Sequence, residues 1–141
     1  MQPPPIHATC ISVGGHAVLI QGASGSGKSD LALRLIDRGA ILVSDDYTLI
    51  KRRADRLFAS APATIVGKLE VRGLGIIAVP YADEAAIALH ICLGENVERF
   101  PMTKKTRKFE GIDVASVHIA AHEASAPIKV EMALKQVLET P

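Results

Sequence analysis

Runs of apolar residues divide the chain into short strands and two amphipathic helices. Continuous or alternating apolar residues predict strands at residues 6–13, 17–20, 40–44, 85–93 and 112–119. Apolar residues at helical spacing predict helices over residues 29–38 and 127–139. Gly39 stands where a helix often ends, and Pro127 suits a first helical turn.

Three other segments have weaker patterns. Residues 47–51 and 56–60 are expected to pair as a hairpin around residues 53–55. Gly73 and Gly75 interrupt a strand-like run at residues 68–79, and the polar segment 94–108 predicts irregular structure. Because no linker or repeat divides the chain, we expect one α/β domain over residues 1–141.

Composition excludes several classes of protein. The chain has 141 residues, 48% of them hydrophobic, which is enough for a packed core. A net charge of +1 and an aromatic content of 4% argue against a nucleic-acid partner. No apolar run reaches the ~18 residues that span a bilayer, and the N-terminus does not resemble a signal peptide. Two isolated cysteines fit a reducing compartment, so we expect a soluble, cytoplasmic protein.

A glycine-rich loop carries the most specific chemistry. It matches G-x-x-x-x-G-K-[ST] in full, with a predicted strand before it and a predicted helix after it; its residues are Gly22, Ala23, Ser24, Gly25, Ser26, Gly27, Lys28 and Ser29. Glycines let successive backbone N–H groups surround phosphate oxygens. The lysine adds charge at the β- and γ-phosphates, and the serine hydroxyl binds Mg²⁺. The motif predicts a site for a nucleoside triphosphate and Mg²⁺ but does not specify a reaction.

Acidic residues follow the loop. Asp45 and Asp46 end a predicted buried strand, where ligands collect in open α/β sheets. One carboxylate there is suited to Mg²⁺ and the other to accepting a proton, whereas the alternative is a turn that caps the strand. Glu70, beside the glycines of residues 73–75, is either a further metal ligand or a solvated side chain. On residue type alone, His7 is typical of the surface.

Together these residues resemble a known family. The segment from His7 through the loop to Asp46, followed by residues 69–79, resembles the catalytic domain of HPr kinase/phosphorylase. The resemblance implies a P-loop α/β domain similar to phosphoenolpyruvate carboxykinase, with a mixed sheet, flanking helices and hexameric assembly. It also implies ATP- and Mg²⁺-dependent phosphorylation of a serine in the phosphocarrier protein HPr, and removal of that phosphate by inorganic phosphate.

The resemblance assigns roles to individual residues. His7, Lys28 and Arg99 match catalytic positions, and Asp45 matches the general base. Mg²⁺ is expected to be held by three residues, Ser29, Asp46 and Glu70.

The chain also departs from the family. Ala78 stands where an acid is usual, and the basic segment tied to dephosphorylation is reduced to residues 126–130, which keep Lys129. The family's separate N-terminal domain is expected to be absent. Two other functions stay open on the sequence: a kinase for small molecules, and a nucleotide sensor without catalysis.

Overall fold

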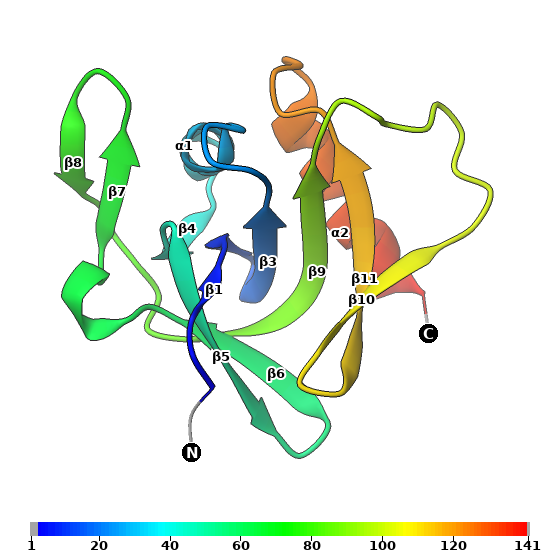
Figure 1. Ribbon diagram of the computed structural model, residues 1–141, viewed down its shortest axis with the longest axis horizontal. Helices are drawn as coiled ribbons and strands as arrows, with labels where there is room; N and C mark the ends of the chain where they lie inside the picture. Colours follow the sequence, from blue (N-terminus) through cyan, green and yellow to red (C-terminus); the bar gives the residue numbers. More distant parts are fainter. Residues whose placement is uncertain (1–2, 141) are drawn as a thin grey trace.

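The computed structural model describes residues 3–140 and has a mixed sheet, a separate two-stranded hairpin and two α-helices (Figure 1). Its strands are β1 (Ile6–His7), β2 (Thr9–Val13), β3 (His16–Gln21), β4 (Ile41–Ser44), β5 (Tyr47–Arg53), β6 (Arg56–Ser60), β7 (Lys68–Val71), β8 (Gly75–Ala78), β9 (Ala85–Leu93), β10 (Lys105–Phe109) and β11 (Ile112–Ile119). The helices are α1 (Lys28–Asp37), α2 (Ala126–Glu139) and the short 3-10 helix η1 (Ala63–Ile65).

The centre of the sheet is parallel. β9 pairs in parallel with β3 on one side and with β11 on the other. β2 pairs antiparallel with both β3 and β4, so β4 runs in the same direction as β3. The strands β3, β4, β9 and β11 therefore all end at one edge of the sheet. In Figure 1, β3, β9 and β11 point toward the top, where the loops that follow them begin.

Two apolar clusters pack on opposite faces of this sheet. Side chains alternate along each strand, so in β3 Val18 and Ile20 point to one face while Ala17 and Leu19 point to the other. The first face is covered by the apolar sides of α1 and α2. The second is covered by the antiparallel hairpin of β5 and β6, which continues the same sheet because β6 pairs antiparallel with β9. The predicted α/β class with a mixed sheet and flanking helices is thus confirmed.

Most predicted elements agree with the structure, and one does not. The expectation of irregular structure at residues 94–108 is wrong for its last part, because β10 pairs antiparallel with β11. β10 is a charged strand at the sheet edge, and such strands lack the apolar alternation that identifies buried ones. The segment at residues 68–79 forms a separate hairpin of β7 and β8, and the first predicted strand is divided at Ala8 into β1 and β2.

α1 ends in a left-handed glycine, as its sequence predicts. The N–H of Gly39 donates to the carbonyl of Ile36, and the N–H of Ala40 donates to the carbonyl of Leu35. This pair of bonds is a Schellman motif, which requires the φ of +111° that Gly39 adopts.

Replacing Gly39 with alanine should therefore destabilise the protein through the backbone alone. Nothing lies within 4 Å of a Cβ at position 39, so the cost is the left-handed conformation, about 1 kcal/mol. Gly94→Ala is the matched control, because its Cβ also meets open space but its backbone is outside the left-handed region. Urea unfolding should show a loss for Gly39→Ala and a change under about 0.5 kcal/mol for Gly94→Ala. Equal effects of the two changes would contradict this account.

Candidate active site

The glycine-rich loop joins the end of β3 to the start of α1. A Cβ at Gly22 would lie 2.5 Å from Ser26 Oγ and 3.1 Å from Leu93 Cβ, so any other residue there would displace its neighbours. Gly27 is the N-cap of α1, with φ of +100°, and no side chain caps the helix. The first N–H groups of the helix therefore remain available to an anion.

Lys28 is held inside this loop. Its side chain is buried, and Nζ donates hydrogen bonds to the carbonyl oxygens of Gly22 (3.0 Å) and Ala23 (3.2 Å). An ammonium group removed from water needs such acceptors. Phosphate oxygens in the loop are alternative acceptors with a full negative charge, which makes them stronger partners for the lysine.

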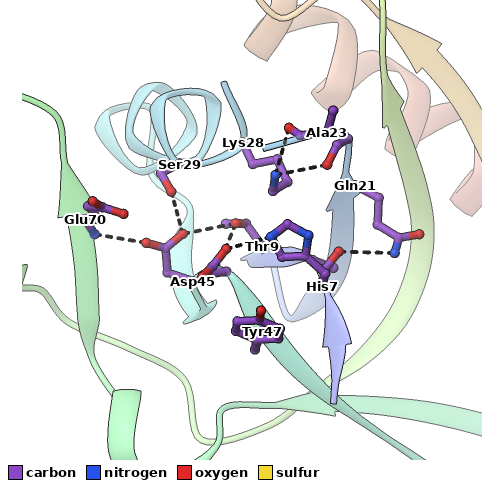
Figure 2. A network of polar contacts seen from close by, with 12 residues as sticks. His7, Thr9, Gln21, Ala23, Lys28, Ser29, Asp45, Tyr47 and Glu70 are labelled. Atoms are coloured by element: carbon purple, nitrogen blue, oxygen red, sulfur yellow. Dashed lines mark hydrogen bonds and ion pairs between the residues drawn. The ribbon is translucent and has the colours of Figure 1, made fainter. Parts of the chain in front are cut away.

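The carboxylate of Asp45 links four elements of the fold. Asp45 follows β4, and its Oδ1 accepts hydrogen bonds from Ser29 Oγ of α1 (2.7 Å) and Thr9 Oγ1 of β2 (3.0 Å) (Figure 2). Its Oδ2 accepts the backbone N–H of Glu70 in β7 (2.9 Å). Only 5% of the residue is exposed. The carboxylate is therefore fixed in place beside the serine that ends the loop motif.

Asp46 lies next in sequence but is placed quite differently. Its backbone adopts φ of +68°, and its N–H donates to Thr9 Oγ1 (3.1 Å). This left-handed conformation turns the side chain away from that of Asp45, and 57% of it is exposed. Its Oδ1 accepts a hydrogen bond from His7 Nε2 at 2.8 Å. His7 comes from β1 and its ring also packs against Tyr47, at 5.2 Å between centroids.

A partly buried chain of hydrogen bonds ends at the backbone of His7. In this chain Ser116 Oγ contacts His90 Nδ1 (2.7 Å), and His90 Nε2 donates to Gln21 Oε1 (2.8 Å). The Gln21 amide then donates to the backbone carbonyl of His7 (3.2 Å). Burial, together with the nearby positive charge of Arg107, lowers the pKa of His90 to about 4. The imidazole is therefore neutral at physiological pH, as its hydrogen bonds require.

The donors near Ser29 fit Mg²⁺ if phosphates complete its coordination. No cluster of three or more His, Cys, Asp or Glu side chains suited to a metal occurs within residues 3–140. Mg²⁺ in nucleotide sites is typically bound by one or two protein oxygens, with phosphate and water as its other ligands. The Ser29 hydroxyl and the Asp45 carboxylate, in contact beside the loop, supply such oxygens.

Three other predicted residues lie outside this network of side-chain contacts. Glu70 is exposed, and only its backbone contacts Asp45. Arg99 is exposed on the loop between β9 and β10, which runs away from β4 and β7 on the other side of β9 and β11 (Figure 1). Lys129, in α2, forms an ion pair with Glu123 at 3.1 Å.

Comparison with known sequences places these features in a family. The family described as the HPr serine kinase C-terminal domain matches residues 2–140. The chain belongs to this family. The resemblance inferred from His7, the loop and the two aspartates is thus confirmed.

Named relatives agree with this assignment to the HPr kinase family. The HPr kinase/phosphorylases of Clostridium tetani and Lactobacillus johnsonii are 34% and 33% identical over 95% of this chain. The chain spans only 46% and 44% of their lengths. The solved Hpr(Ser) kinase/phosphatase of Coxiella burnetii has a TM-score of 0.83 and 29% identity, with 95% of each chain covered.

Neither α1 nor α2, of 10 and 14 residues, has the length to span a bilayer.

Sequence reasoning missed three residues that are hydrogen-bonded to the candidate site. Thr9, Gln21 and His90 are polar residues within or at the end of otherwise apolar strands. A polar residue on a buried strand needs a hydrogen-bond partner, so its position in an apolar run is the sequence feature that could have identified these residues. His90 is fully buried and is joined through Gln21 to the backbone carbonyl of His7.

His90 should make the fold sensitive to mild acid. Its pKa is lowered from 6.5 to about 4 by folding, so below about pH 6.5 the unfolded chain binds a proton that the folded chain does not. The free energy of unfolding then falls as the pH falls, by about 2 kcal/mol between about pH 8 and about pH 5. Urea unfolding at several pH values measures this slope. His90→Gln, which cannot titrate, is the control, and an equally steep loss in that variant would refute the assignment.

Proposed function

We propose that the chain transfers the γ-phosphoryl group of ATP to a serine of an HPr-type phosphocarrier protein. The observation that carries this proposal is the meeting of a phosphate-binding loop with two differently placed aspartates at one edge of the sheet. A nucleotide-binding module without catalysis has no need of an exposed carboxylate paired with a histidine. The names of the relatives favour HPr as the acceptor.

In the forward reaction, the loop holds the β- and γ-phosphates and Lys28 exchanges its carbonyl partners for phosphate oxygens. The serine Oγ of HPr attacks the γ-phosphorus, and the bond from that phosphorus to the bridging oxygen of ADP breaks. The proton of the serine hydroxyl passes to a carboxylate of the site. Lys28 offsets the negative charge that develops on the transferred group.

The geometry favours Asp46 as the proton acceptor, in place of the sequence-based assignment of Asp45. The Asp45 carboxylate is buried and already accepts three hydrogen bonds. Asp46 is more than half exposed, and His7 orients it. A protein substrate can reach Asp46, whereas the buried Asp45 carboxylate is already occupied by its three donors.

With Asp46 as the proton acceptor, Asp45 becomes the candidate carboxylate ligand of Mg²⁺. Ser29 and Asp45 would hold Mg²⁺ together with the nucleotide phosphates, and the ion would neutralise charge on the β- and γ-oxygens. Glu70 is a weaker candidate for a metal ligand. Its backbone contacts Asp45, but its carboxylate is exposed and would have to reorient to reach the ion. The expected role of Asp46 as a ligand is not favoured by its pairing with His7.

The reverse reaction needs a site for inorganic phosphate, whose attack on phosphoserine would release pyrophosphate. The two basic residues considered for it are Lys129, which is paired with Glu123, and Arg99, which lies on a loop outside the network. Either would have to change partner or position to take part. Phosphorolysis, hexameric assembly, a likeness to phosphoenolpyruvate carboxykinase, a single domain and a cytoplasmic location remain predictions.

The acceptor is tested by incubating the chain with HPr, ATP and Mg²⁺ and locating phosphoserine by mass spectrometry. A panel of small metabolites under the same conditions tests the alternative of a small-molecule kinase. Nucleotide binding without transfer to any acceptor would favour a sensor and contradict the proposal. Excess inorganic phosphate, added after phosphorylation, tests the reverse reaction through the release of pyrophosphate.

Asp46→Asn should abolish most phosphoryl transfer while leaving nucleotide binding nearly unchanged. Asparagine tolerates the left-handed backbone at this position but cannot take the proton, so we expect a loss of at least about 100-fold in kcat. Asp45→Asn should instead weaken binding of Mg²⁺-ATP, because its carboxylate serves the metal. If Asp46→Asn stays active, and Asp45→Asn binds Mg²⁺-ATP normally without transferring phosphate, then Asp45 is the base.

A further inference from the structure

A hollow lies beside the glycine-rich loop, on the side away from the aspartates. Its volume is about 250 Å³, and its walls are residues 24–26 of the loop, residues 94–95 after β9 and residues 120–122 after β11. These three segments follow parallel strands, so they meet at one edge of the sheet. The volume is below the range of roughly 300–1,000 Å³ for sites that hold whole ligands, and it suits one part of a larger molecule.

The walls of the hollow are held in place by the fold. Arg34 of α1 donates hydrogen bonds to the carbonyl oxygens of Ala121 and Glu123, which fixes the segment after β11 against the helix. A Cβ at Gly27 would lie 3.3 Å from the Cβ of Ala121, so the loop and this segment are in close contact. The N–H of Gly94 donates to the carbonyl of Ile119. The hollow is therefore preformed beside the phosphate-binding loop.

The order of the strands gives a bound nucleotide a direction. From β4, which leads to the aspartates, the sheet runs through β2 to β3 and its loop, and then to β9 and β11. Phosphoryl transfer requires the γ-phosphate to face Asp46. A nucleoside triphosphate carries its γ-phosphate and its nucleoside at opposite ends, so the nucleoside then extends toward β9 and β11, where the hollow lies.

The lining chemistry fits a nucleoside better than a further phosphate. No lysine or arginine lines the hollow, and its two titratable residues are Glu95 and His122. A carboxylate repels phosphate but accepts hydrogen bonds from hydroxyl groups. A histidine ring offers a flat face for a base and a nitrogen for a hydrogen bond.

We propose that this hollow receives the nucleoside of ATP, with Glu95 accepting hydrogen bonds from the ribose hydroxyls and His122 packing against the base. The inference rests on the proposed use of ATP, but it concerns binding and not transfer. It predicts that affinity depends on Glu95 and His122 only for ligands that carry a nucleoside. The affinity for inorganic tripolyphosphate, which has the three phosphates alone, should not depend on either residue.

Calorimetric titration of the whole chain with Mg²⁺-ATP and with Mg²⁺-tripolyphosphate tests this directly. Glu95→Ala and His122→Ala should each weaken ATP binding by about tenfold and change tripolyphosphate binding by less than about twofold. Glu95→Ala should also remove any preference for ATP over 2′-deoxyATP. Glu98→Ala is the matched control, because Glu98 lies on the same loop, is exposed and pairs with Lys105.

Two results would overturn the proposal. One is wild-type binding of tripolyphosphate as tight as that of ATP, which would mean that the nucleoside makes no favourable contact. The other is an equal loss for both ligands in the two variants, which would indicate damage to the loop. Because no HPr is present in these titrations, a failure to phosphorylate HPr would refute the proposed kinase function and leave the nucleoside site standing.

Discussion

The site depends on the need of one buried carboxylate for hydrogen-bond donors. A charge taken out of water is costly unless polar groups surround it, and Asp45 is almost wholly buried. Its donors come from α1, β2 and β7, while the residue itself follows β4. Satisfying this charge therefore brings together the loop helix, the strands β2 and β4 of the sheet, and the separate hairpin of β7 and β8. The arrangement that stabilises Asp45 also aligns the elements that carry the proposed chemistry.

The fold could be predicted where burial leaves a pattern in the sequence. β9 and β11 have the predicted bounds, because β9 is a long, mostly apolar run and β11 has apolar residues at alternating positions. β10 could not be found in this way, since four of its five residues are exposed and charged or polar. Its position follows from pairing with β11, which is a property of the assembled sheet. The packing of β5 and β6 over one face is likewise a tertiary arrangement that local patterns do not encode.

The glycine-rich loop was predictable from the spacing of its motif residues, but the different environments of the residues around it were not. Lys28 and Ser29 belong to a contiguous motif, so their roles follow from the sequence. Thr9 reaches Asp45 across 36 positions, a contact that requires the order of strands. Asp45 and Asp46 are chemically identical and adjacent, and a single left-handed backbone angle separates their environments. Sequence reasoning had no access to that angle, and it assigned the proton acceptor to the residue that the geometry favours less.

The two carbonyl contacts of Lys28 have a consequence for selectivity. The folded chain already bears the cost of dehydrating this ammonium group, so a ligand entering the loop gains little by covering it again. What a ligand must do is outcompete two neutral amide oxygens, and a neutral molecule has no advantage in that competition. Only a highly anionic group therefore displaces the two carbonyl oxygens from Lys28. Its hydrogen bonds also hold the backbone of the loop in place, so that the loop has its shape before a polyphosphate binds.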